Sequence, residues 1–132
     1  NNVGRAPLHL AGNLDAVRLL LDRGASLQAG DKNNDTPLHI ACWKGSMDFV
    51  RLLLNRGAEL ESMNNGGFTP LHVAVLNNRC KVFRLLLDRG ANVEATTLAR
   101  TTPLSLACQT GHVEMVWLLV RRCPWLVVDG QE

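Results

Sequence analysis

The sequence predicts an all-α fold, a solenoid of stacked helix-turn-helix units, and three observations lead to this fold class. A proline-containing hexapeptide recurs as APLHLA (6–11), TPLHIA (36–41), TPLHVA (69–74) and TPLSLA (102–107). A second motif follows each of these as LLLDRGA (19–25), LLLNRGA (52–58), LLLDRGA (85–91) and LLVRRCP (118–124). Between the two motifs stands a residue type that tolerates a left-handed turn, namely Gly45, Asn78 or Gly111 in the last three units. A fixed period of about 33 residues is typical of repeat architectures.

The first helix of each unit is predicted to begin at the proline. Thr36, Thr69 and Thr102 precede the prolines, where a hydroxyl caps backbone N–H groups. Proline is favoured at the first helical position because the N–H that it lacks has no partner there. These helices must be short, since the glycine or asparagine arrives eight residues after the proline.

The second helix of each unit is predicted to be amphipathic. In the segment from Met47 to Arg56, Val50 and Leu53 recur at helical spacing on one face, whereas Asp48 and Arg51 point away from it. Gly24, Gly57 and Gly90 are expected to end these helices. Arg23, Arg56, Arg89 and Arg122 precede that stop, where a cation complements the partial negative charge of a helix end.

A single helix pair cannot bury its own apolar face, so neighbouring pairs are expected to share a continuous core. The predicted core residues occupy equivalent positions in the last three units: Leu38, Ala41, Val50 and Leu53, then Leu71, Ala74, Phe83 and Leu86, then Leu104, Ala107, Val116 and Leu119.

The TPLHxA hexapeptides and their spacing resemble the ankyrin repeat over roughly Gly4 to Val128. The resemblance implies an ankyrin-repeat solenoid whose helix pairs are joined by β-hairpin-like turns. It also implies one array over residues 1–132, with repeats at approximately 1–30, 31–63, 64–96 and 97–129.

The pattern departs from the repeat at both ends. Ala6 replaces the capping threonine, and three residues are missing after Ala11, so the first unit is expected to be the least ordered. At the other end, Cys123 replaces the stop glycine and is followed by Pro124 and the apolar run 125–128. Two interpretations stay open for this run: the native chain continues into another repeat or domain, or the run folds back onto the last helix pair.

Composition excludes several classes of protein. The chain has 14 Lys and Arg against 12 Asp and Glu, a formal charge of +2, without a block of like charges. The longest apolar run, Met115 to Val120, is far shorter than the roughly 20 residues of a membrane span. Asn1 to Ala6 does not resemble a signal peptide, and the four cysteines are too sparse for a disulfide framework. We therefore expect an intracellular protein, cytoplasmic or nuclear.

No catalytic residue, metal site or cofactor is predicted. His9, His39 and His72 are in register, but equivalent residues of stacked helices lie roughly 8–10 Å apart, which is too far for shared zinc ligation. The ankyrin resemblance implies instead that this histidine ties the turn of its own repeat to its neighbour by hydrogen bonds.

The cysteines have separate predicted roles. Cys42 and Cys108 follow the alanine of their motifs and are expected to be small core residues, and Cys80 replaces an apolar residue at the start of a second helix. Cys123, near the end of the array, is the one thiol expected to have some reactivity.

Partners of ankyrin-repeat proteins usually lie along a concave groove made of the turn tips and the exposed side of the first helices. The matching residues here are Trp43, Phe68, Leu76, Met63, Lys44, Asn77, Arg5, Lys32, Asn33, Asp35, Asn65, Leu98, Thr101, Gln109 and Thr110. Trp43, Leu76, Phe68 and Met63 are expected to form one apolar patch, with Trp43 and Phe68 as its anchors. The alternative for Trp43 is a purely structural role in the stack.

The sequence therefore predicts a non-catalytic protein-interaction module, part of a larger adaptor, scaffold or regulator, that binds another protein or peptide and no small-molecule substrate. One alternative is a nucleic-acid or phospholipid surface along the arginine columns, the second of which is Arg18, Arg51 and Arg84. Interleaved acidic residues and the low net charge make nucleic acid the weaker choice. A mechanical or self-assembling array is a further alternative.

Overall fold

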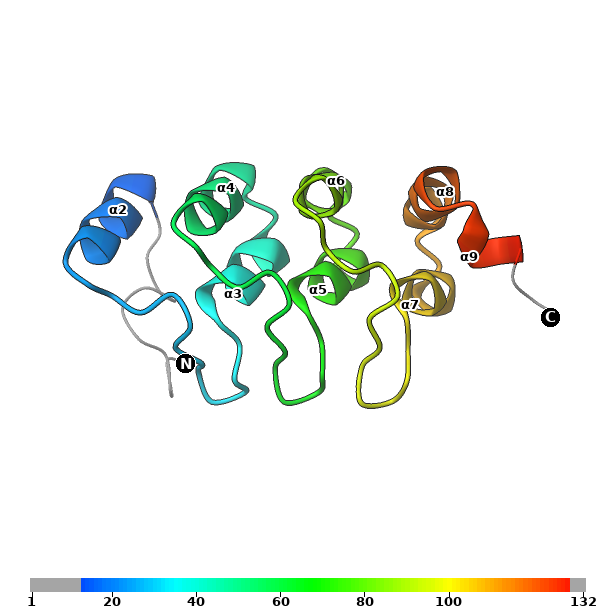
Figure 1. Cartoon of the computed structure of the whole chain (residues 1–132), viewed down its shortest axis with the longest axis horizontal. Coiled ribbons are helices and arrows are strands. Elements are labelled where there is room, and N and C mark those ends of the chain that lie inside the picture. Colours follow the sequence, from blue (N-terminus) through cyan, green and yellow to red (C-terminus); the bar gives the residue numbers. More distant parts are fainter. Residues whose placement is uncertain (1–12, 129–132) are drawn as a thin grey trace.

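The computed structural model describes residues 13–128, and every regular element in that range is a helix, which confirms the predicted fold class (Figure 1). The elements are α2 (Leu14–Asp22), α3 (Pro37–Lys44), α4 (Met47–Asn55), α5 (Pro70–Leu76), α6 (Cys80–Asp88), α7 (Pro103–Thr110), α8 (Val113–Arg122) and α9 (Trp125–Val128). The sequence features predicted for Arg5, Ala6, His9 and the shortened segment after Ala11 lie outside the described residues.

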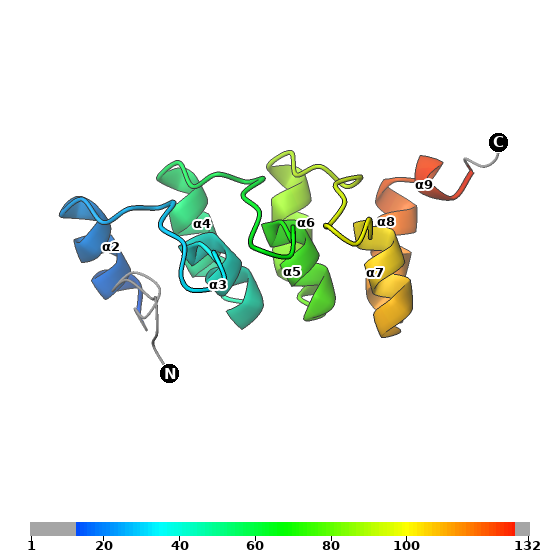
Figure 2. The ribbon, with the colours of Figure 1, turned by 90° about the horizontal axis from the view of Figure 1, so that it is seen from below.

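The helices form two layers. The outer layer is the row α2, α4, α6 and α8, and the inner layer is the row α3, α5 and α7, as Figures 1 and 2 both show. Each inner helix packs against the outer helix that follows it. Neighbouring inner helices also pack against one another from α3 to α7, and neighbouring outer helices do so from α2 to α6. The core is therefore a ladder between the two rows, as the repeat predicts.

The predicted caps and stops are confirmed. The hydroxyls of Thr36, Thr69 and Thr102 accept the backbone N–H groups three residues later, at the start of α3, α5 and α7. Gly45, Asn78 and Gly111 adopt positive φ angles of 77°, 56° and 76° directly after or near the inner helices. The stop glycines Gly24, Gly57 and Gly90 also have positive φ, between 92° and 97°.

The predicted core is correct in the second and third helix pairs and only partly correct in the fourth. All eight core residues of α3 to α6 are buried, as are Ala107 and Leu119. Leu104 and Val116 are only half-buried, although Leu71 and Phe83 at the equivalent positions of the third pair are 1% and 0% exposed. The third pair is covered by α7 and α8, whereas the far side of α7 and α8 faces no further helix pair among the described residues.

Two predictions about cysteines were wrong. Cys42 is buried as predicted, but Cys108 at the end of α7 is exposed, because only a following helix pair would cover that position. Cys123, the one thiol predicted to have some reactivity, is buried, and its burial raises the pKa of the thiol. Reactive thiolate character is therefore not favoured at Cys123.

The turns between the helix pairs are β-hairpin-like without forming regular strands within residues 13–128. Equivalent backbone hydrogen bonds close three of them, from Asp31 N to Asp35 O at 3.0 Å, from Asn64 N to Phe68 O at 3.1 Å and from Thr97 N to Thr101 O at 3.0 Å. Neighbouring turns are also joined, since Leu98 N donates to Gly66 O at 3.0 Å. The turns consequently form a row beside the inner helices (Figure 1).

The apolar run after Cys123 folds back, in agreement with the second of the two interpretations. It forms α9, which packs against α8. Leu126 packs against the core at the position that Leu60 and Val93 hold in the arms of the preceding units. The fourth arm therefore keeps its repeat register while taking a helical conformation.

Candidate functional site

A hollow of about 320 Å³ lies between α3, α5 and the turns that precede them. It is lined by Asp35, His39, Ile40, Trp43, Asn64, Phe68, Val73, Leu76 and Asn77. A concave, mostly apolar site with a few polar groups has the composition expected for a binding site. We call it the α3/α5 groove.

Three of the predicted residues supply large apolar side chains to the groove. Trp43 on α3 is 53% exposed, and Leu76 on α5, in the same register, is 41% exposed. Phe68 enters from the turn before α5 and its ring meets the edge of His72 at a centroid distance of 5.8 Å. The groove therefore exposes apolar side chains that are held by a packed scaffold.

His39 fixes the position of Phe68. Its Nδ1 accepts the backbone N–H of Thr36 at 3.1 Å, so its Nε2 carries the proton and donates to the Phe68 carbonyl at 2.8 Å. Burial lowers the pKa of His39, although the Phe68 carbonyl and nearby carboxylates act in the opposite direction, so the ring is neutral at neutral pH. The histidine thus caps its own helix and holds the next turn.

His72 repeats this arrangement one unit later. Its Nδ1 accepts Thr69 N–H at 3.1 Å, and its Nε2 lies 3.0 Å from the Ala95 carbonyl and 3.2 Å from that of Thr101. Burial lowers its pKa as well. Both ring nitrogens of both histidines are engaged with backbone groups, which matches the structural role that the resemblance implied.

Asn64 shapes the turn that carries Phe68. Its Oδ1 accepts the backbone N–H groups of Gly66 and Phe68, both at 3.0 Å, and its Nδ2 donates to Asp35 Oδ1 at 2.9 Å. One asparagine side chain therefore closes its own turn and joins it to the preceding turn. Sequence reasoning missed Asn64, and the asparagine four residues before Phe68 in a turn was the signal that was available.

The far end of the groove is held by side chains from the next helix pair. Arg79 Nε donates to the carbonyl of Trp43 at 3.1 Å, and His112 Nε2 donates to that of Leu76 at 3.0 Å. These carbonyls belong to the last turns of α3 and α5, where a carbonyl group finds no backbone N–H partner within its own helix. The two bonds repeat at the same spacing of 36 residues, and neither was predicted from the sequence.

The structure brings together five of the predicted binding residues and leaves the others that it describes outside the α3/α5 groove. Asp35, Trp43, Phe68, Leu76 and Asn77 line it, together with Ile40 and Val73, which were not predicted. Met63 is exposed but is not among the lining residues. The remaining predicted residues lie at the turn tips or on the exposed parts of α3 and α7: Lys32, Asn33, Lys44, Asn65, Leu98, Thr101, Gln109 and Thr110.

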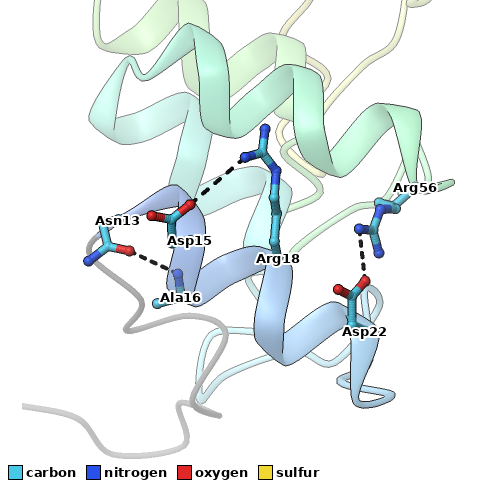
Figure 3. A network of polar contacts seen from close by, with 6 residues as sticks. All are labelled: Asn13, Asp15, Ala16, Arg18, Asp22 and Arg56. Atoms are coloured by element: carbon cyan, nitrogen blue, oxygen red, sulfur yellow. Dashed lines mark hydrogen bonds and ion pairs between the residues drawn. The ribbon is translucent and has the colours of Figure 1, made fainter.

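The first arginine column joins neighbouring outer helices. Arg56 Nη2 lies 2.9 Å from Asp22 Oδ1, as Figure 3 shows, and Arg122 Nη2 lies 2.9 Å from Asp88 Oδ1. Between them, Arg89 donates to Asn55 Oδ1 at 3.0 Å. Each arginine thus reaches the residue that ends the preceding outer helix.

Two of the three arginines of the second column are paired within their own helices. Arg18 and Arg51 each lie 3.9 Å from an aspartate three residues earlier. Figure 3 shows the first of these pairs beside Asn13, which caps α2 by accepting Ala16 N–H.

Within residues 13–128, no group of three His, Cys, Asp or Glu side chains is placed to hold a metal ion. None of the helices in that range combines the length and the apolar character needed to cross a bilayer.

Known proteins share the repeat. The family profile described as "Ankyrin repeats (3 copies)" matches residues 8–97, and "Ankyrin repeat" matches residues 100–129. A 45-residue segment is 49% identical to protein phosphatase 1 regulatory subunit 27 of Mus musculus, and covers 32% of this chain and 29% of that protein. NF-kappa-B inhibitor epsilon of Homo sapiens is also 49% identical over 45 residues, which cover 32% of this chain and 9% of that protein. The segment thus spans less than a third of either relative, whereas the family profiles span nearly the whole chain, and the chain belongs to the ankyrin-repeat family.

Proposed function

We propose that this chain is a non-catalytic protein-interaction module, part of a larger adaptor, scaffold or regulator, which binds a segment of another protein in the α3/α5 groove. The observation that carries the proposal is the apolar lining of that groove, which the exposed Trp43 and Leu76 and the half-buried Phe68 make on a frame of hydrogen bonds. Aromatic side chains at the centre of an interface commonly contribute 2 kcal/mol or more.

The names of the relatives support an interaction role. One is called a regulatory subunit and another an inhibitor, and both names describe action on another protein. The polar frame supports it as well, because His39, Asn64 and Arg79 hold the backbone around the apolar side chains before any partner arrives. Such preorganisation reduces the entropy cost of binding.

The pairing of the arginines makes the groove a better candidate than the arginine columns. Arg56 and Arg122 are engaged by aspartates, and Arg18 and Arg51 lie beside aspartates on their own helices. A nucleic-acid or phospholipid surface would bind with an affinity that falls steeply as salt rises. Peptide binding in an apolar groove depends on salt much less.

Selection from random peptides displayed on phage tests the proposal. Peptides selected on the wild-type chain are synthesised, and their affinity for the wild type, Trp43→Ala and Phe68→Ala is measured by calorimetry. We expect each variant to weaken binding by about 30-fold, the equivalent of about 2 kcal/mol.

Trp117→Ala is the matched control. Trp117 lies on α8, is 58% exposed and does not line the groove, so its replacement should leave the affinity unchanged. Circular dichroism shows whether each variant is folded. Selected peptides that bind folded Trp43→Ala and Phe68→Ala as tightly as the wild type would contradict the proposal.

A further inference from the structure

Arg79 lies at the end of the α3/α5 groove where α3 stops. Its Nε donates to the Trp43 carbonyl at 3.1 Å, and the side chain of Trp43 lines the groove. Asn77, which also lines the groove, ends α5 two residues before Arg79. A guanidinium group is therefore held directly beside a residue that we expect to anchor a partner.

Gly45 allows this guanidinium to lie close against the end of α3. A Cβ atom at Gly45 would lie 2.8 Å from Arg79 Cδ and 3.0 Å from Arg79 Nε, which is closer than side-chain carbon atoms pack. Together with the bond to Trp43, this close approach restricts the Arg79 side chain before any partner binds. A restricted side chain loses less entropy when it joins an interface.

The fold itself needs only one N–H group from this position. In the next helix pair the equivalent residue is His112, and it makes the same contact with a single ring nitrogen, which donates to the Leu76 carbonyl at 3.0 Å. Arg79 makes the contact with Nε and keeps the N–H groups of both Nη atoms. A pair of such N–H groups has the geometry that binds the two oxygens of a carboxylate.

A second hollow, of about 190 Å³, adjoins the guanidinium. It is lined by Gly45, Arg79, Cys80, Lys81 and Val82, and we call it the Arg79 hollow. Its two charged residues, Arg79 and Lys81, are both cationic, and no carboxylate within residues 13–128 lies at ion-pair distance from either. Both therefore differ from the arginines of the outer helices that aspartates engage.

Two further charges act near this hollow and oppose each other. Burial raises the pKa of the Cys80 thiol, and the charge of Glu114 raises it further, whereas the charge of Arg84 lowers it. The sign of the charge at the hollow is therefore set by Arg79 and Lys81. A positive hollow beside an apolar groove is complementary to a segment that combines an apolar and an acidic side chain.

We propose that the segment bound in the α3/α5 groove carries an aspartate or glutamate next to its apolar anchor, and that Arg79 binds this carboxylate at the Arg79 hollow. The proposal rests on the proposed function, to which it adds the chemistry of the partner. Arg79 supplies the directed hydrogen bonds, and Lys81 adds the attraction of a flexible point charge.

Arg79→His is the test variant, because His112 shows that an imidazole can make the contact with a helix-end carbonyl. At about pH 8 an imidazole with an ordinary pKa is uncharged, so the variant loses the cation. Peptides selected on the wild-type chain should share an acidic residue at a fixed distance from an apolar one. One such peptide, and an analogue with the side-chain amide in place of the carboxylate, are measured by calorimetry on both proteins.

We expect the wild type to bind the acidic peptide about fivefold more tightly than the amide analogue, the ratio for an exposed ion pair. Folded Arg79→His should bind both peptides equally, and high salt should reduce the preference of the wild type. Arg23→Gln is the matched control. Arg23 is an exposed cation directly after α2 and lines neither hollow, so this variant should keep the fivefold preference.

Equal binding of the two peptides by the wild type would overturn this inference, as would a preference that persists in folded Arg79→His. In either case, weaker binding to Trp43→Ala would leave the proposed function standing. Selected peptides that bind independently of Trp43 and Phe68 would remove the proposed function and this inference with it. An analogue with phosphoserine at the acidic position that binds far more tightly than the carboxylate peptide would also overturn it, in favour of a phosphorylated partner.

Discussion

The indole Nε1 of Trp125 donates a hydrogen bond to Glu94 Oε2 at 3.1 Å and so ties α9 to the arm of the preceding unit. One repeat earlier, the backbone N–H of Asn92 donates to Glu61 Oε2 at 2.9 Å. Glu61 and Glu94 are 33 residues apart, as are Asn92 and Trp125. A side chain thus takes over the contact that the backbone makes in the regular repeat.

Replacing Trp125 by Phe keeps an aromatic ring and removes the donor. We expect the free energy of unfolding to fall by about 0.5–1 kcal/mol, the low range for a hydrogen bond, because both partners are exposed. Urea denaturation measures it. Trp117→Phe is the control, since the ring of Trp117 packs beneath Arg121, and an equal loss in both variants would contradict the role of the Glu94 contact.

Removal of the threonine caps should have unequal effects. Thr69 caps α5 and also bonds the buried His72, whereas Thr102 caps α7 beside the exposed Ser105. We expect Thr69→Ala to lower the free energy of unfolding by about 1–2 kcal/mol and Thr102→Ala by about 1 kcal/mol or less. Chemical denaturation of both variants checks the order, and a larger loss for Thr102→Ala would be inconsistent with the structure.

Acidification should destabilise the array. Burial lowers the pKa of His39 and His72 below the ordinary value of 6.5, so the unfolded chain binds protons more readily in the window below that value. Their contribution to stability is complete above about pH 7 and is lost as the pH falls through 6.5 toward the lowered folded-state pKa values. Protonation at Nδ1 would also remove the acceptor for Thr36 and Thr69 N–H.

Urea denaturation between pH 7.5 and 5 measures this dependence. A double variant, His39→Gln with His72→Gln, should be less stable at pH 7.5 and should show a flatter dependence on pH. A wild-type stability that rises on acidification through this window would show that the assigned protonation state is wrong.

The hydrogen bonds and ion pairs that the first arginine column makes between neighbouring outer helices should contribute little to the free energy of unfolding. Asn55 already takes the place of an aspartate in accepting Arg89, so Asp88→Asn should preserve the hydrogen bond from Arg122 and leave the free energy of unfolding within about 0.5 kcal/mol of wild type. Asp88→Ala should cost less than about 1 kcal/mol, because both side chains are partly exposed. Thermal denaturation at low and high salt would reveal a larger contribution if one existed.

Most of the fold could be predicted because its determinants are local. A threonine before a proline, a glycine eight residues later and an apolar stripe each act within one unit, and Thr36, Gly45 and Val50 all adopt the predicted arrangement. Contacts between units were not predictable in the same way. The bonds from Arg79 to Trp43 and from Asn64 to Asp35 depend on how far neighbouring pairs are offset, and no local pattern encodes that offset.

The wrong predictions about core positions of the fourth helix pair share one physical cause. The core residues were predicted by assuming that equivalent positions are equally buried in every unit. The burial of a side chain depends, however, on whether a neighbouring unit covers it. Cys108 and Leu104 occupy core positions of the repeat and are exposed or half-buried because they face outward from the fourth pair. Of the four residues expected to form one apolar patch, Trp43, Phe68 and Leu76 line the α3/α5 groove and Met63 does not. Ile40 and Val73 also line it and were overlooked because they resemble ordinary core residues.

The short reach of the links between units determines how the molecule would respond to tension. His39 to Phe68, Arg79 to Trp43 and Arg122 to Asp88 each connect one unit only to its immediate neighbour. A pulling force applied at the two ends would therefore detach units one after another instead of rupturing the whole array at once. Each released unit of about 33 residues would lengthen the chain by on the order of 110 Å, so the array would extend in equal steps.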